Sequence, residues 1–329
     1  MKFTTEQLNA EGIRQWDWIK VQFPDCPLLL GNGFSLNFSS RLLYRNLYEK
    51  YIENCPEDAK KLFKEFKSTN FEIILEHLES TERVCSALEI EQQRISKNKD
   101  LIKQGLIDSI NRIHPTPDEI KLDQIKLVAE QIKEFEQIFT TNYDLFLYYL
   151  ILESKKFGDY FYMPFFEDER FKRFKTGDVF KKNHIYYLHG ALFVFEKSVE
   201  TIKIKRNENW LIEVITKEIS KDNYPLFISE GTSEMKLKGI QSNNYLTYCF
   251  RELKENKNKN LVIYGQSLSD QDLHIVKAID ENYDKVAISI RISENKTMNE
   301  LKSEMNRIKS ILKNTEVEFY DSTSLFKFE

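Results

Sequence analysis

The residues best suited to chemistry lie in four short polar segments, and each follows a run of apolar residues. The first is Gly31-Asn32-Gly33-Phe34-Ser35, after the apolar run 27–30. Glycines let a backbone approach a phosphate closely, and a following helix N-terminus presents unpaired N–H groups. The spacing is GxGxxS in place of GxGxxG, and no acidic residue ends a second strand about 20 positions later, as a conventional dinucleotide fingerprint requires. The segment predicts phosphate contact, and a simple tight turn is the alternative.

The second segment, Thr140-Thr141-Asn142-Tyr143-Asp144, separates the apolar run 135–139 from a helical pattern that begins at Leu145. The amide of Asn142 is suited to hold a hydroxyl group or a water molecule, and Asp144 could support the loop. The alternative is structural, because Thr141 or Asn142 could simply cap the following helix.

The third segment, Tyr187-Leu188-His189-Gly190, ends the apolar run 185–188. An imidazole accepts a proton near neutral pH, so His189 at a strand end is the candidate general base, against the alternative of a structural histidine. The other histidines are His184, His274, His77 and His114, of which we expect the last two to be solvated.

The fourth segment is Gly265-Gln266-Ser267, after the apolar run 261–264. Its glycine and serine could contact a phosphate or a ribose, and a capped turn is the alternative. Ser229-Glu230-Gly231-Thr232-Ser233 is a similar but weaker case.

The elements that must position these segments follow from the apolar pattern. Short continuous apolar runs predict strands buried on both faces, as in a parallel sheet. These runs are 27–30, 135–139, 185–188, 226–228, 261–264, 286–290 and 317–320. Helical periodicity lies between them, at 41–53, 59–67, 71–78, 84–110 and 118–133. The alternation predicts a single α/β domain over 1–329, with a Rossmann-like, doubly wound parallel sheet.

The spacing of the strands also predicts insertions. The first two strands lie much further apart than one crossover needs, so we expect residues 40–132 to form a helical insertion or subdomain. A second insertion is expected at 155–183. In open α/β sheets, ligands bind at the carboxyl ends of strands, which is where all four polar segments fall.

Composition excludes several classes of protein. The 329 residues are 41% hydrophobic and 30% charged, with a formal net charge of −4. This is the composition of a globular chain, and it argues against direct nucleic-acid binding, which requires excess basic residues. The four cysteines form no CxxC pair, so no metal site is expected and a reducing cytoplasm fits the chain. No apolar run approaches the roughly 20 residues that cross a membrane.

Taken in order, the four segments resemble the motifs of the sirtuin-like superfamily. Gly31 to Ser35 resembles its first turn, with Asn32 where alanine is usual, and Asn142-Tyr143-Asp144 resembles its Asn-x-Asp element. Leu188-His189-Gly190 and Gly265-Gln266-Ser267 resemble its Leu-His-Gly and Gly-x-Ser elements. The four-cysteine zinc module of protein-deacylating sirtuins is absent, and Phe38-Ser39-Ser40-Arg41 is at best a remnant of their cofactor loop. The chain is therefore most similar to the zinc-free bacterial branch, whose members include NAD⁺ hydrolases of antiphage defence.

This resemblance implies an NAD⁺ glycohydrolase in a regulated defence or toxin effector. Nicotinamide leaves as a neutral pyridine, so the enzyme must stabilise an oxocarbenium-like ribose and position a nucleophile. Asn142 would orient water or ribose, His189 would act on the ribose hydroxyls or the water, and Asp144 would hold the loop or stabilise the developing charge. The cofactor-contacting residues would be Gly31, Asn32, Gly33, Ser35, Thr141, Gly265 and Ser267.

Other functions remain as alternatives. One is a sensor that binds NAD⁺ or ADP-ribose without turnover, and another is a protein deacylase or ADP-ribosyltransferase. An uncontrolled NAD⁺ hydrolase would kill its host, so we expect gating by homo-oligomerisation or by a co-encoded regulatory protein.

Overall fold

The computed structural model describes residues 3–39, 47–53, 55–69, 71–114, 119–165, 168–177, 183–205, 211–228 and 232–328. Its centre is an eight-stranded sheet in the order β1-β13-β12-β11-β2-β3-β7-β4, with every neighbouring pair parallel. The strands are β1 (Ile13–Arg14), β2 (Leu28–Leu30), β3 (Gln137–Thr140), β4 (Phe157–Gly158), β7 (Asn183–Tyr187), β11 (Asn260–Tyr264), β12 (Lys285–Ile290) and β13 (Glu316–Asp321). The predicted Rossmann-like α/β fold is confirmed.

The order of the strands places a switch point at the centre of the sheet. After the short edge strand β1, the chain forms β2, adds β3, β4 and β7 on one side, and then crosses to add β11, β12 and β13 on the other side. Ligands of such sheets bind outside the carboxyl ends of the strands where the order reverses, here between β2 and β11. These ends carry the first and fourth polar segments.

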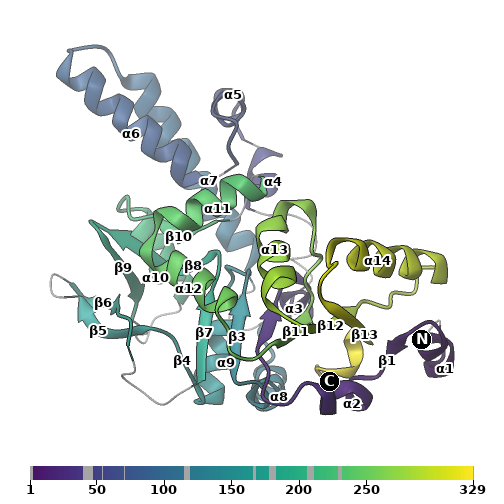
Figure 1. Ribbon diagram of the computed structural model, residues 1–329. Coiled ribbons are helices and arrows are strands. Elements are labelled where there is room, and N and C mark those ends of the chain that lie inside the picture. Colours follow the sequence, from purple (N-terminus) through teal and green to yellow (C-terminus); the bar gives the residue numbers. More distant parts are fainter. Residues whose placement is uncertain are drawn as a thin grey trace.

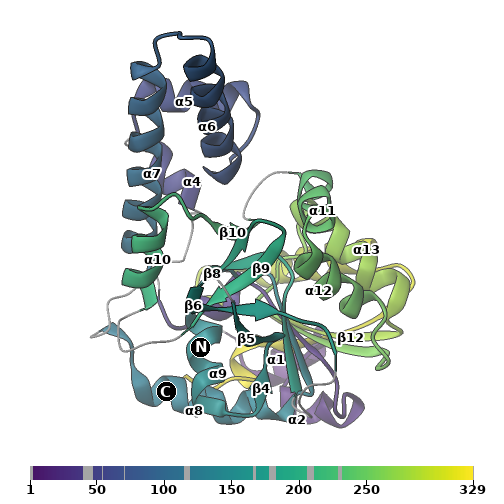
Figure 2. The same cartoon turned by 90° about the vertical axis from the view of Figure 1, so that its left-hand side faces the viewer.

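Helices cover both faces of the central sheet. In Figure 2, α8 (Leu122–Gln131) and α9 (Phe146–Ser154) lie on one side, and α12 (Asn244–Lys254) and α13 (Leu273–Asn282) lie on the other. The amphipathic α14 (Met298–Ile311) connects β12 to β13. Near the N-terminus lie α1 (Thr5–Ala10) and α2 (Trp16–Ile19), and α3 (Asn32–Ser35) follows β2 directly.

A helical arm projects from the sheet (Figures 1 and 2). It contains α4 (Leu47–Ile52), α5 (Glu57–Glu65), α6 (Phe71–Ala87) and α7 (Gln93–Ile113). The single helix predicted over 84–110 is wrong, because α6 ends and α7 folds back against it. The turn between them contains Glu89 with a φ of +55°, and neither glycine nor proline marks it in the sequence. His114, at the end of α7, is also buried and not solvated as expected.

A second, antiparallel sheet was not predicted. Its order is β10-β8-β9-β6-β5, and its strands are β5 (Phe161–Phe165), β6 (Asp168–Phe174), β8 (Gly190–Lys197), β9 (Glu200–Ile204) and β10 (Pro225–Phe227). The apolar run 226–228 therefore belongs to this sheet and not to the parallel one. Because β8 and β10 are buried on both faces, their sequences carry the same continuous apolar pattern as parallel strands. The helices α10 (Leu211–Ile219) and α11 (Ser233–Ser242) flank β10 along the chain.

Within the described residues, no helix combines the length and the apolar character needed to cross a bilayer. The four cysteines are all buried and unpaired with one another.

Candidate functional site

Glycines bring the first and fourth segments into backbone contact at the switch point. The N–H of Gly31 donates to the carbonyl of Tyr264 at 2.9 Å, and the N–H of Gly33 donates to the carbonyl of Gly265 at 2.8 Å. A Cβ on Gly33 would lie 2.7 Å from the Cα of Gly265, which is too close for any other residue type. Both N–H groups are thus bonded within the protein, so the glycines serve the close approach of the two loops. Direct phosphate contact by these residues stays a prediction.

Asn142 is held by the first segment. Its Nδ2 donates to the carbonyl of Gly31 and to Oγ of Ser35, both at 2.9 Å. The carbonyl only accepts, so this bond fixes which end of the amide is nitrogen. The acceptor Oδ1 meets no donor among the described residues, and it is the end of the amide that a water or a ribose hydroxyl could bond.

Asp144 anchors the same loop through a hydrogen bond with Ser35. Oγ of Ser35 donates to its Oδ2 at 2.5 Å, and the N–H of Phe146 donates to its Oδ1 at 2.9 Å, at the start of α9. Burial raises the pKa of Asp144, and these two hydrogen bonds oppose that rise. Both carboxylate oxygens are thus bonded within the protein, which favours the loop-holding role over direct contact with a sugar.

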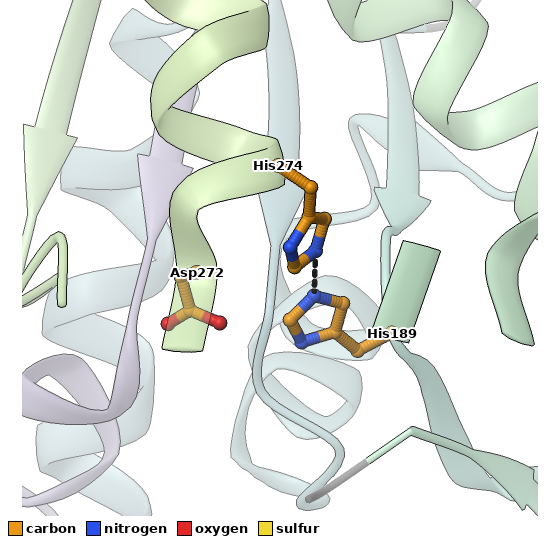
Figure 3. A group of neighbouring side chains, drawn as sticks. All are labelled: His189, Asp272 and His274. Carbon is orange, nitrogen blue, oxygen red and sulfur yellow. Dashed lines mark hydrogen bonds between the residues drawn. The ribbon is translucent and has the colours of Figure 1, made fainter. Parts of the chain in front are cut away.

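His189 belongs to a buried chain of polar groups that sequence reasoning did not assemble. Its Nε2 lies 3.0 Å from Nε2 of His274, and Nδ1 of His274 lies 3.0 Å from Oγ of Ser233 (Figure 3). The hydroxyl of Ser233 also accepts the N–H of His274 at 2.7 Å. The hydroxyl of Ser233 keeps a proton that it can donate to Nδ1 of His274, and in that arrangement Nε2 of His274 is protonated and donates to His189. This assignment satisfies every contact in the chain.

Burial keeps both imidazoles neutral. Burial, with a smaller effect from the nearby charge of Lys236, lowers the pKa of His189 to about 3. Burial likewise lowers the pKa of His274 to about 4. Neutral imidazoles accept hydrogen bonds at pH 7, but a group with so low a pKa is a weak base.

Gln266 links the loop after β3, through Thr141, to Asp272. Its Nε2 lies 3.2 Å from Oγ1 of Thr141 and 3.4 Å from Oδ2 of Asp272. Asp272 also pairs with the buried ammonium of Lys236 at 2.8 Å. The loops after β2, β3 and β11 therefore form one connected polar network at the carboxyl edge of the sheet, and the histidine chain lies beside Asp272 of that network.

The ligand atoms of His189, Asp272 and His274 lie within 4.8 Å of one another, a spacing that a metal ion could use. Figure 3 shows the two imidazoles facing each other, with the carboxylate to one side. Because Lys236 already supplies a cation to Asp272, we interpret the group as an ion pair beside a histidine pair.

The remaining predicted residues lie at the rim or outside the described chain. Asn32 and Ser267 are exposed, and the backbone carbonyl of Ser267 accepts a bond from Arg307 at 2.5 Å. Residues 40–46 and 229–231 lie outside the described residues, so the predicted roles of Arg41 and of Ser229 to Gly231 are not described. Oγ1 of Thr232 caps α11 by accepting the N–H of Met235.

The fold and the polar edge define a Rossmann-like α/β protein with its side-chain chemistry gathered at the switch point. The chain matches the model of the DUF4917 family, described as a domain of unknown function, over residues 28–326. It therefore belongs to this family. No curated protein matches it.

Proposed function

We propose that this protein hydrolyses NAD⁺ at the nicotinamide–ribose bond, as a regulated effector of the kind that the sirtuin-like resemblance implies. The observation that supports this most is the placement of Asn142 and His189 after two neighbouring strands, β3 and β7. The N–H of Leu188 donates to the carbonyl of Thr140 at 2.8 Å, so the loops that carry the two side chains leave the sheet side by side. The loop of Asn142 contacts the switch point through Gly31, and the loop of His189 follows the next strand along the sheet. Substrates of this fold bind at the switch point.

In the proposed reaction, the bond between C1′ of ribose and the ring nitrogen breaks, and its electron pair stays on nicotinamide. A water oxygen bonds to C1′ and releases a proton, so the products are ADP-ribose, nicotinamide and H⁺. Oδ1 of Asn142 orients the water or a ribose hydroxyl. His189 is neutral and weakly basic, and its Nε2 already faces Nε2 of His274, so its Nδ1 is the atom that bonds the water or a ribose hydroxyl and orients the attack without removing a proton.

The site is closed in this conformation, because Asn142 is 7% exposed and His189 is 3% exposed. Substrate access requires the strand-end loops to separate. A closed resting state supports the expectation that activity is gated by a partner, a second copy or a ligand.

The test is a fluorescence assay with etheno-NAD⁺ on the purified full chain, followed by Asn142→Ala and His189→Ala. Each substitution should lower kcat by roughly 10²-fold or more if the residue acts in the transition state. Asn98→Ala and His114→Ala are matched controls, because these residues are as buried but lie in the helical arm. Equal losses in all four variants would mean general damage to the fold, and would contradict the assignment.

The low pKa of His189 favours one second candidate, a sensor that binds NAD⁺ without cleaving it. Calorimetric binding of NAD⁺ that is lost in Asn142→Ala, with no nicotinamide released at any protein concentration, would support the sensor and reject the hydrolase.

A further inference from the structure

A cavity of about 490 Å³ lies apart from the strand-end site, between α9, β4 and the second sheet. Figure 2 shows strands β5, β6 and β9 of that sheet beside α9 and β4. None of the predicted catalytic or NAD⁺-contacting residues lines this cavity. Its volume falls within the roughly 300–1,000 Å³ that is usual for small-molecule sites.

The cavity concentrates positive charge in a chain that is acidic as a whole. Among the described residues, four lysines line it, Lys155, Lys172, Lys203 and Lys205, and one carboxylate, that of Asp159, so four positive charges and one negative charge give +3. The formal net charge of the whole chain is −4. Burial lowers the pKa of Lys172, and the neighbouring charges of Lys203 and Lys205 lower it further. An anion in the cavity would relieve this repulsion.

Lys203 is buried in the wall of the cavity, where its side chain is held by neighbouring groups. Only 7% of it is exposed, and its ammonium group pairs with Asp159. The same ammonium lies 5.7 Å from the ring centroid of Tyr148 and 5.6 Å from that of Phe161. The lysines are thus combined with aromatic walls.

Tyr187 provides an independent observation that points to a ligand. It lines the cavity and is 1% exposed, and its hydroxyl finds no hydrogen-bond partner in the described part of the chain. Buried hydroxyl groups are nearly always paired, with the protein, with water or with a ligand.

We propose that this cavity binds a nucleoside monophosphate, with its phosphate among Lys172, Lys203 and Lys205 and its base against the aromatic walls. Lysines supply the charge for a phosphate, and an aromatic wall supplies a face on which a base can stack. The proposal does not depend on the cleavage of NAD⁺.

The test is titration calorimetry on the full chain with AMP, GMP, CMP and UMP, and with adenosine and inorganic pyrophosphate as incomplete ligands. At least one monophosphate should bind at least tenfold more tightly than adenosine and pyrophosphate. Lys172→Glu and Lys205→Glu should each weaken that binding at least tenfold. Both substitutions spare the buried pair of Lys203 with Asp159, so the fold should survive. Lys126→Glu, on the exposed face of α8, is the charge-matched control and should bind as the unaltered chain does.

Three results would overturn the proposal. One is that no monophosphate binds. Another is that pyrophosphate binds as tightly as the best monophosphate, which would reveal an anion site without base recognition. The third is that Asn142→Ala abolishes nucleotide binding while the two lysine variants retain it, which would place the nucleotide at the strand-end site. Because binding is measured without turnover, failure here is distinguishable from failure of the proposed hydrolysis.

Discussion

Replacement of Ser35 by alanine should destabilise the protein far more than the loss of one hydroxyl normally does. Oγ of Ser35 accepts from Asn142 and donates to Asp144, and only 1% of Ser35 is exposed. A hydrogen bond to a charged group contributes about 1.5–3 kcal/mol, and a neutral one contributes about 1 kcal/mol. The free energy of unfolding should therefore fall by about 2.5–4 kcal/mol, measured by urea titration at pH 7.

The loss should also depend on pH in a defined direction. Burial holds the pKa of Asp144 above its ordinary value, and Ser35→Ala removes a bond that opposes this rise. An acid whose pKa is higher in the folded state binds more protons when folded, so it destabilises the fold increasingly as the pH rises above the unfolded value of about 4. The deficit of Ser35→Ala should accordingly shrink as the pH falls towards about 4.

Ser154→Ala is the matched control, because this serine is 5% exposed and bonds only the carbonyl of Ile151 in its own helix. It should cost about 0.5–1 kcal/mol, independently of pH. If Ser35→Ala cost no more than Ser154→Ala, or showed no dependence on pH, the network around Asp144 would not hold the loop as described.

Three further predictions concern neighbouring parts of the site. Lys236→Met leaves the buried carboxylate of Asp272 without its ion-pair partner, and the free energy of unfolding in urea should fall by about 3–5 kcal/mol. Adding Asp272→Leu should recover most of this loss. If nothing is recovered, Lys236 stabilises the protein by packing and not by its charge. Gly33→Ala places a Cβ 2.7 Å from the backbone of the facing loop and should cost about 1–3 kcal/mol. Gly239→Ala meets only a flexible side-chain end within a helix, so an equal loss there would argue against the close-approach explanation. The folded-state pKa of His189, about 3, lies below its unfolded value, so stability should fall by up to about 1.4 kcal/mol per unit as the pH drops below about 6.5. The lowered pKa values of His114 and His274, both about 4, contribute to the same slope, so His189→Gln should reduce the slope without abolishing it. An unchanged slope would show that His189 does not titrate as described.

The parallel sheet could be predicted because its main strands are continuous apolar runs, several of which stop at a glycine or a small polar residue. The runs 27–30, 135–139, 185–188 and 261–264 correspond to β2, β3, β7 and β11. Their carboxyl ends meet at one edge by the geometry of a parallel sheet, so the four segments could be grouped without knowledge of any side-chain contact.

The second sheet and the α6–α7 hairpin escaped prediction for local reasons. Strand β8 starts directly after His189 and is buried on both faces. Its sequence therefore contains neither a polar linker nor the alternating pattern that would indicate an antiparallel strand. The hairpin turns at Glu89, a residue type that rarely adopts a positive φ. Nothing in either stretch of sequence marks the change of direction.

The partners of His189 could not be predicted because they depend on distant chain segments. His274 was one of four other histidines with no local feature to distinguish it, and Ser233 lies 41 positions before it. In the sequence, Gln266 is only the middle residue of a Gly-x-Ser turn, and nothing indicates that its amide bonds both Thr141 and Asp272. A single sequence shows which residues lie at the strand ends, but it does not show which of them touch.

The position of His189 between the two sheets has a mechanical consequence. It follows β7 of the parallel sheet, and Gly190, with a φ of +73°, turns the chain at once into β8 of the antiparallel sheet. The backbone carbonyl of His189 accepts the N–H of Ile228, just beyond β10, at 2.7 Å. A rotation of one sheet against the other would move this residue and tilt its imidazole. Substitutions far out in the antiparallel sheet could therefore alter the strand-end site without changing any residue of the site itself.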